Sequence, residues 1–259
     1  MAQVKETAVV YSQEELAPEI FSMWITTETA KEAKPGQFIS VYSKDGSRLL
    51  PRPISICEAD PEEGRLRIVY RIAGAGTKEF SSFESGDPID IMGPLGNGFP
   101  QEGENVFLIG GGIGIPPMLE LAKNLNCEKQ MILGYRDGNL FLRDEFEAYG
   151  EVFVATEDGS AGTKGNVLDA IRENGLTADV MYACGPTPML RALKQYVIFP
   201  WKKKWPAGLE HVLPASAKAA RWITTAMSII SGSAKTVPYF WPRRWIYDEY
   251  KSKSGRSGA

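Results

Sequence analysis

The chain has little cysteine, almost no histidine and none of the common metal or nucleophile motifs. Its 259 residues contain three cysteines, at positions 57, 127 and 184, and a single histidine, His211. The cysteines form no CxxC pair, which excludes a disulfide framework and a zinc-ribbon type of site. No HExxH, Cys/His ligand spacing or Gly-x-Ser-x-Gly occurs, so we expect neither a catalytic metal nor a hydrolase nucleophile.

Long hydrophobic runs are also missing. No apolar stretch reaches the length that spans a bilayer, and residues 1–6 lack the basic-then-apolar pattern of a signal peptide. A hydrophobic fraction of 43% is enough for real cores. We therefore expect a globular protein of the reducing cytoplasm, with no membrane partner.

The formal net charge of −3 hides a discontinuity in composition. Residues 197–259 carry 11 lysines and arginines against three acidic residues, and five of the six tryptophans. Residues 1–196 are acidic overall. The two stretches differ as if they came from different proteins.

The first hundred residues have the pattern of an all-β domain. Short apolar runs at 37–42, 53–57, 66–70 and 88–92 are separated by Gly, Pro and Asp clusters. Strands at this spacing predict an antiparallel β-barrel over residues 1–100.

The pattern changes after Pro100 to alternating strands and helices. Strands are predicted at 106–110, 131–135, 152–155 and 180–184, and helical segments at 116–124, 144–149 and 167–171. This alternation predicts a parallel-sheet α/β domain over 101–196, with the boundary near 99–104. Residues 197–259 are expected to be poorly ordered.

The strongest local signal is the run from Gly110 to Pro117, Gly-Gly-Gly-Ile-Gly-Ile-Pro-Pro. Glycines leave backbone N–H groups open to a diphosphate, and a following helix points its positive end at the same charge. The spacing is not the GxGxxG fingerprint. Phosphate binding and a plain tight turn are about equally supported by this run alone.

Two segments of the barrel half are candidate flavin contacts. Arg52-Pro53-Ile54-Ser55 offers a guanidinium for phosphate and a hydroxyl for a flavin edge. Tyr70-Arg71 leads into Gly74-Ala75-Gly76-Thr77, where the tyrosine could cover a ring and backbone N–H groups could hold phosphate. Taken singly, a surface arginine before a proline turn and a hairpin tyrosine are the simpler interpretations.

Two further segments follow strands of the second half. Cys184-Gly185-Pro186 ends the last predicted strand, where ligands of α/β sheets bind, and Cys184 could face a nicotinamide or be a buried small hydrophobe. Glu157 and Asp158 could accept from ribose hydroxyls and disfavour a 2′-phosphate, or form an exposed acidic turn.

Taken together and in this order, these segments resemble the ferredoxin–NADP reductase superfamily. The resemblance covers residues 1 to about 196 and is closest to the electron-transfer subunits of type B dihydroorotate dehydrogenases. Gly93-Pro94-Leu95-Gly96-Asn97-Gly98-Phe99 and Ala155 to Ser160 belong to the same set of matching stretches. Each stretch is weak alone, and six in the right order are specific.

The resemblance implies an FAD held by the barrel and an NAD(H) held by the α/β domain. Hydride would pass between nicotinamide C4 and flavin N5, and no catalytic acid or base is required, because the cofactors supply the chemistry. The cofactor-binding residues that it implies are Arg52, Pro53, Ile54, Ser55, Ile68, Val69, Tyr70, Arg71, Gly74, Gly76, Thr77, Gly110, Gly111, Gly112, Gly114, Ile115, Pro116, Glu157, Asp158, Cys184, Gly185 and Pro186.

It also implies a [2Fe–2S] cluster that relays electrons to an FMN-containing catalytic subunit, which oxidises dihydroorotate in pyrimidine biosynthesis. The two kinds of subunit would form a heterotetramer. The family holds the cluster with four cysteines of a C-terminal segment. This chain has no cysteine after Cys184.

A frameshift near 197–199 accounts for this departure. Codons can be chosen for residues 199–218 so that the frame one base earlier encodes a cysteine-rich peptide, and the change in composition falls at the same place. The alternative is a genuine basic, aromatic segment of the kind that binds anionic lipid or nucleic acid. We favour the frameshift and expect no nucleic-acid partner.

Two other functions remain open at this point. Related flavin subunits serve hydrogenases, sulfur reductases and ferredoxin-dependent transhydrogenases, and share the barrel motifs. A non-catalytic dinucleotide-binding module is the third possibility, although such a module needs no flavin-binding residues at 52–55 or 70–71.

Overall fold

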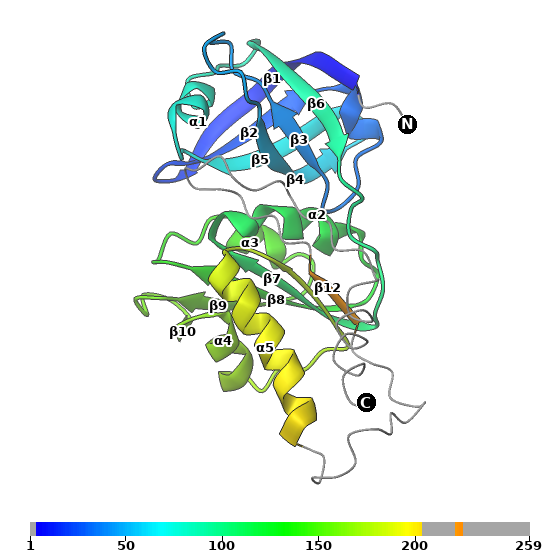
Figure 1. The fold of residues 1–259 in the computed structure, drawn as a ribbon, viewed down its shortest axis with the longest axis vertical. Coiled ribbons are helices and arrows are strands. Elements are labelled where there is room, and N and C mark those ends of the chain that lie inside the picture. Colours follow the sequence, from blue (N-terminus) through cyan, green and yellow to red (C-terminus); the bar gives the residue numbers. More distant parts are fainter. Residues whose placement is uncertain (1–3, 204–220, 225–259) are drawn as a thin grey trace, which may run out of the picture.

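A barrel stacked on a twisted sheet makes up the fold of this chain (Figure 1). A computed structural model describes residues 4–203 and 221–224. Sequence reasoning predicted a β-barrel followed by a parallel-sheet α/β domain, and this fold class is confirmed.

Six antiparallel strands close the barrel in the order β1-β2-β5-β4-β3-β6. The strands are β1 (Val4–Ala17), β2 (Ile20–Thr26), β3 (Phe38–Val41), β4 (Arg52–Asp60), β5 (Arg65–Arg71) and β6 (Pro88–Leu95), with the 3-10 helix η1 (Glu28–Lys31) and the helix α1 (Ala75–Phe80) between them. Closure leaves no strand edge unpaired.

Strand β5 is buried on both faces. Leu66, Ile68 and Tyr70 point into the barrel core, and the alternate residues Arg67 and Val69 point outward yet are also buried. Since side chains of a strand alternate between faces, the outer face of the barrel must itself be covered at this point. The covering comes from the second half of the chain.

The second half forms a six-stranded parallel sheet in the order β10-β9-β8-β7-β11-β12. Its elements are β7 (Asn105–Gly111), η2 (Gly112–Gly114), α2 (Pro116–Asn124), β8 (Glu128–Tyr135), α3 (Arg143–Phe146), β9 (Glu151–Thr156), β10 (Thr163–Lys164), α4 (Val167–Glu173), β11 (Val180–Cys184), α5 (Thr187–Lys203) and β12 (Arg221–Thr224).

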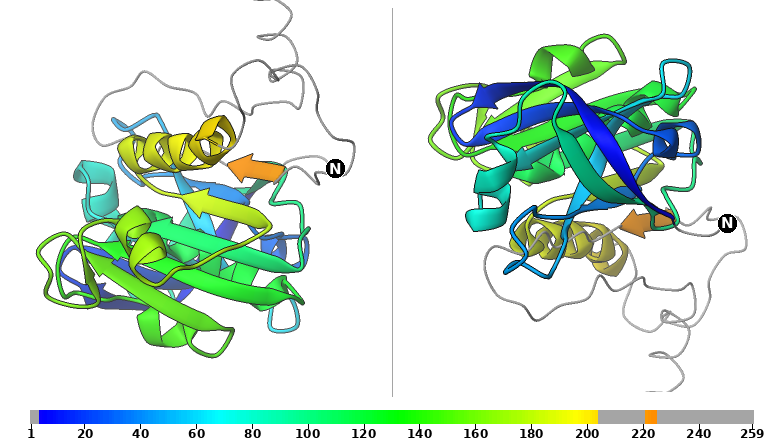
Figure 2. Two further views of the ribbon diagram at one scale, coloured as in Figure 1. Left: turned by 90° about the horizontal axis from the view of Figure 1, so that it is seen from below. Right: turned by 90° about the horizontal axis from the view of Figure 1, so that it is seen from above.

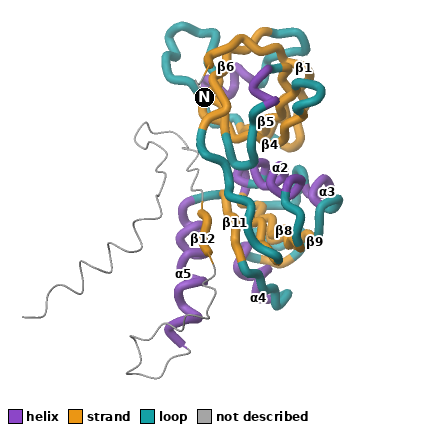
Figure 3. Tube along the Cα trace, turned by 90° about the vertical axis from the view of Figure 1, so that its right-hand side faces the viewer, coloured by secondary structure: helices purple, strands orange, loops and turns teal. Residues whose placement is uncertain are grey.

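Helices cover both faces of this sheet (Figures 2 and 3). Helices α2 and α3 share one buried cluster with the sheet, and α4 and α5 share another on the opposite face. The first cluster continues into the barrel through Ala17, Cys57 and Val69. Helix α2 therefore lies between sheet and barrel, as Figure 1 shows.

The connecting segment between Leu95 and Asn105 is anchored on both sides. The Phe99 ring packs against Gly36 of the barrel half and meets the Tyr182 ring of β11 edge-on at 5.8 Å. The Tyr182 hydroxyl donates to the Glu102 carbonyl at 2.7 Å. A domain boundary at 99–104, with domains at 1–100 and 101–196, stays a prediction.

Sequence reasoning missed β1, β2, α1 and α5, and found the other long elements within a few residues of their ends. Charged residues interrupt the apolar alternation of β1, which hid it. Of residues 197–259, the structure describes the end of α5 and β12, which pairs in parallel with β11. The remaining residues of the segment expected to be poorly ordered lie outside the described ones.

Candidate functional site

The cluster of candidate flavin residues forms where β4 begins beside α1. A Cβ atom added to Gly76 would lie 2.5 Å from Nε of Arg52, so the guanidinium rests directly on the first turn of α1. The first N–H groups of a helix have no intrahelical acceptor. The Arg52 guanidinium therefore lies beside a helix turn whose first N–H groups lack intrahelical acceptors, and phosphate binding there stays a prediction.

The loop before α1 holds its shape through Thr77. Its hydroxyl accepts from the N–H groups of Ala73 and Gly74 at 2.8 and 3.2 Å. Gly74 has an extended backbone and is exposed. Thr77 thus acts in this structure by shaping the loop, and direct contact with a phosphate stays a prediction.

Tyr70 lies inside the barrel rather than at its surface. Its ring stacks on Phe21 at 5.9 Å and meets Phe80 edge-on at 6.2 Å, and its hydroxyl donates to Gln13 at 2.7 Å. Burial raises the pKa of this hydroxyl well above its usual value. Only about 2% of Tyr70 is exposed, so the structure shows no open ring face, and a role of Tyr70 in flavin binding stays a prediction.

In the glycine turn between β7 and α2, the surroundings of each position show why glycine is required there. A Cβ at Gly114 would lie 2.3 Å from the carbonyl oxygen of Cys184, and one at Gly110 would lie 2.7 Å from Cα of Ile115. Gly112 has a positive φ of 52° and nothing within 4 Å of its missing Cβ. Two of these glycines permit close packing, and the third presents backbone to open space, as a diphosphate cradle needs.

The parallel sheet places the other candidates along one edge. The carboxyl ends of β11, β7, β8 and β9 lie next to each other in that order. Cys184, the glycine turn and Glu157 therefore follow one another over three strand spacings, roughly 14 Å. An extended dinucleotide has its nicotinamide, diphosphate and adenosine ribose in this same sequence.

Cys184 is a buried thiol and not a nucleophile. It is 2% exposed, and burial raises its pKa to about 12. This burial fits the simpler interpretation, a small buried hydrophobe, and contact of Cys184 with a nicotinamide stays a prediction.

The two acidic candidates after β9 differ in what they do. The Asp158 carboxylate accepts from the N–H and hydroxyl of Ser160 at 2.9 and 2.6 Å, and these bonds hold its pKa below the usual range. The Glu157 side chain is exposed, with no hydrogen bond or ion pair found for it among the described residues. Glu157 therefore has the freer carboxylate of the two, and contact of either with a ribose stays a prediction.

Sequence reasoning missed one cation on this edge. Arg136 directly follows β8, is exposed, and so lies between the glycine turn and Glu157 along the edge. Arg136 could have been found from the sequence, because it is a charged residue in the first position after a predicted parallel strand.

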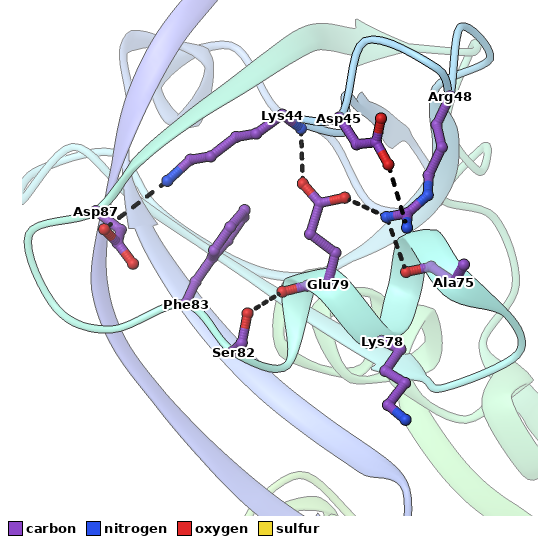
Figure 4. A pocket seen from close by; sticks show the side chains of 9 residues that line it. All are labelled: Lys44, Asp45, Arg48, Ala75, Lys78, Glu79, Ser82, Phe83 and Asp87. Carbon is purple, nitrogen blue, oxygen red and sulfur yellow. Dashed lines mark hydrogen bonds and ion pairs between the residues drawn. The ribbon is translucent and has the colours of Figure 1, made fainter.

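An open pocket of about 730 Å³ lies beside α1 on the barrel. Figure 4 shows that most of its charged side chains face one another, whereas that of Lys78 points away from them. Arg48 contacts Glu79 at 2.6 Å and Asp45 at 3.3 Å, and Lys44 lies 3.8 Å from Asp87. These five charged side chains are paired within the pocket wall.

The three cysteines do not come together as a metal site. Cys57 and Cys184 are buried and Cys127 is half-buried, and burial raises the pKa of all three thiols, which disfavours the thiolate that iron requires. Within residues 4–203 and 221–224 no group of three or more His, Cys, Asp or Glu could hold a metal ion. Nor does that part of the chain contain a helix with the length and apolarity needed to cross a membrane.

Comparisons with known proteins agree with this arrangement. Residues 108–195 match the family of oxidoreductase NAD-binding domains. The chain is 42% identical over 201 residues to the dihydroorotate dehydrogenase B (NAD(+)) electron transfer subunit of Bacillus caldolyticus, covering 74% of this chain and 78% of that protein. The protein of the same name from Fusobacterium nucleatum is 43% identical over 202 residues, covering 73% and 78%.

Solved structures with the same fold include flavin enzymes. An NADH-dependent reduced ferredoxin-NADP oxidoreductase superposes with a TM-score of 0.67 at 34% identity, over 73% of this chain and 71% of that one. A ferredoxin NADP+ reductase from Neisseria gonorrhoeae with bound FAD and NADP gives a TM-score of 0.66 at 16% identity, over 86% and 98%. The second likeness concerns the fold alone.

Proposed function

The chain belongs to the family of electron transfer subunits of dihydroorotate dehydrogenase B, and we propose from this that its two sites exchange electrons across the junction of barrel and sheet. It is a subunit of an FAD-dependent NAD(H) oxidoreductase. When bound, the flavin and nicotinamide supply the hydride chemistry. The residues of this chain bind, orient and shield the two rings.

On the flavin side, Arg52 and the first turn of α1 fit a diphosphate. The support is the packing of the Arg52 guanidinium on Gly76, which leaves no room for a Cβ there. Ser55, at 2% exposure on the outward face of β4, would bond the flavin edge. Residues 53–54, 68–71, 74 and 77 complete the proposed FAD site.

On the nicotinamide side, residues 110–116 would hold the diphosphate of NAD(H). The support is the open face of Gly112 at the start of η2 and α2. Cys184, Gly185 and Pro186 would line the nicotinamide. Glu157, with Asp158 shaping its turn, would accept from the adenosine ribose and disfavour NADPH.

One observation carries the proposal: β5, which ends at the flavin residues, lies against the glycine turn of η2. Two nucleotides bound at these places would meet end to end. The purified full-length chain should show flavin absorbance, and NADH should bleach it under anaerobic conditions. Protein that takes up no flavin after incubation with FAD would contradict the proposal.

The partner follows from the family. Relatives are named as subunits of dihydroorotate dehydrogenase B, so a catalytic partner subunit is implied. We propose that this partner contains FMN, oxidises dihydroorotate, and assembles with the chain as a heterotetramer in the cytoplasm. Co-expression and co-purification with candidate dihydroorotate-oxidising subunits of the same genome test this, and failure of every candidate to bind would count against it.

A [2Fe–2S] cluster does not fit the residues of this chain. Two of its three cysteines are buried in the described fold, and the sequence has none after Cys184. No electron step is therefore assigned to a cluster here. Electrons from NADH should still reach a soluble dye through FAD, without iron–sulfur absorbance.

We attribute the missing ligands to a frameshift near 197–199. The change of composition at this point supports it. Of the residues it would affect, 204–220 and 225–259 lie outside the described ones. Resequencing both strands across codons 190–210 decides the matter. An intact frame would remove the frameshift and leave a genuine basic, tryptophan-rich segment.

A ferredoxin-linked role is the second candidate. The 34% identity to an NADH-dependent reduced ferredoxin-NADP oxidoreductase favours it over a hydrogenase or sulfur reductase partner. A pull-down from the native organism separates the two roles, because only the partner differs.

A further inference from the structure

Helix α2 connects the two proposed sites physically. It begins at Pro116, directly after the glycine turn, and it packs against β4, which begins at Arg52. Its residues from 116 to 122 are all buried. A helix that is apolar all round normally sits in a core, and one charged residue, Glu120, lies within the buried stretch of this one.

Glu120 bonds the helix to the barrel. It is 5% exposed, and its Oε2 accepts from the backbone N–H of Ala59 in β4 at 3.0 Å. Its Oε1 accepts from Nδ2 of Asn124 at 2.8 Å. A buried carboxylate is retained only where its bonds are made, because unpaired burial is costly.

The backbone of β4 is irregular at this point. A β-bulge lies between Ile56 and Glu58, just before the residue that Glu120 binds. Bulges redirect a strand and occur next to active sites. From Ala59 β4 runs back four residues, roughly 13 Å, through this bulge to Ser55 at the proposed flavin edge.

An ion pair makes a second connection across the junction. Arg67 of β5 has a side chain that is 6% exposed, and it contacts Glu58 of the barrel at 2.7 Å. Both of its terminal nitrogens also reach Glu145 of α3, the second at 3.1 Å. Such a two-pronged contact fixes orientation as well as distance.

We propose that Glu120 and the Arg67–Glu145 pair are positioning residues, which lock the α/β half against the barrel and so set the separation at which hydride passes between nicotinamide and flavin. The inference rests on the proposed function. Domains of one chain commonly move relative to each other, whereas two polar connections around a shared apolar cluster oppose such motion here. An error of about 1 Å in the geometry of reacting groups costs on the order of 100-fold in rate.

The test uses the FAD-loaded full chain and anaerobic stopped-flow reduction by NADH. Glu120→Leu and Glu145→Ala are compared with Glu120→Gln, which keeps an acceptor for Ala59, and with Glu147→Ala. Glu147 is the matched control, since it lies two residues from Glu145 and pairs with Arg143 without crossing the junction.

We expect the first two variants to lower the rate constant of flavin reduction at saturating NADH by roughly 10- to 100-fold. The long-wavelength absorbance of a nicotinamide ring lying over flavin should weaken in parallel. FAD content and NADH affinity should stay within about twofold of wild type, and Glu120→Gln and Glu147→Ala should behave as wild type.

Wild-type rates in FAD-loaded Glu120→Leu and Glu145→Ala would overturn the inference and leave the proposed function standing. The inference would also be overturned if these variants lost only affinity for NADH and kept the wild-type rate constant at saturation. A wild-type chain that binds no FAD would overturn the proposed function itself. If Glu120→Leu does not fold, Glu145→Ala carries the test, because its side chain is 41% exposed.

Discussion

The contact between Arg52 and Gly76 depends on a single missing Cβ. In Gly76→Ala the added methyl would displace the guanidinium from the first turn of α1, and a flexible side chain can move away at little cost to folding. We expect FAD affinity to fall about tenfold or more, as for loss of one charged hydrogen bond, with a change in melting temperature of a few degrees at most. Isothermal titration calorimetry of the apoprotein with FAD measures the affinity, and thermal unfolding measures the melting temperature.

Gly46→Ala is the control for this substitution. Gly46 lies in the loop between β3 and β4 and has nothing within 4 Å of its missing Cβ. Equal FAD affinity in the two variants would show that Arg52 does not need its place on α1.

The choice between NADH and NADPH is expected to depend on Glu157. Replacing it with Ser removes the only exposed carboxylate proposed to face the ribose, while Arg136 on the neighbouring strand end remains to attract a 2′-phosphate. The ratio of kcat/KM for NADPH to that for NADH in dye reduction should rise at least tenfold. Asp158→Ser should change this ratio less, since that carboxylate bonds Ser160. A larger effect at Asp158 would reverse the assignment.

The buried carboxyl of Glu120 should make stability depend on pH. Burial raises the pKa of Glu120, despite the N–H of Ala59 and the nearby Lys123, and Glu58 adds to the rise. A raised pKa in the folded state favours the protonated form. The contribution of Glu120 to stability is therefore full below the ordinary carboxyl pKa of 4.5 and is lost as pH rises through the higher folded-state pKa. Glu120→Gln should gain stability over wild type at pH 7, and the gain should shrink towards pH 4.5.

Urea unfolding of both proteins at several pH values tests this. A difference in unfolding free energy that does not vary with pH would mean that Glu120 does not titrate differently on folding.

At the scale of elements, the segment that connects β6 to β7 holds the two halves together through the Phe99 side chain. The ring is 7% exposed and touches Gly36 on one side and Tyr182 on the other. We expect Phe99→Ala to lose about 3 kcal/mol of stability, the lower end for a buried phenylalanine, and also to slow flavin reduction by NADH. Phe83→Ala is the control, since Phe83 is equally buried but lies within the barrel cluster. If both variants slow reduction equally, Phe99 has no special place at the junction.

The elements also show what local patterns can predict. Strands β7 and β11 and helix α2 were found nearly to the residue, because continuous apolar runs bounded by glycine and proline leave few alternatives. Strand β1 was missed, since its exposed polar side chains, among them Lys5, Thr7 and Glu14, dilute the pattern. Helix α1 was expected as a loop because only six residues form it.

At the scale of the whole molecule, the barrel and the sheet share a core. Ala17, Cys57 and Val69 of the barrel belong to the same buried cluster as Met118 and Leu119 of α2. We therefore expect the two halves to unfold together. Calorimetry should give a single transition with equal calorimetric and van't Hoff enthalpies, and two separated transitions would show independent domains.

The sequence by itself determined which segments could bind nucleotides and in what order they occur. Glycine runs, Arg52 and the strand patterns are local, and local chemistry limits what they can form. Only the tertiary structure decided that Gly114 packs against Cys184 while Gly112 faces open space, and that Glu120 and Arg67 are buried. Those properties depend on what another part of the chain brings within a few ångströms, and no residue carries that information in its own neighbourhood.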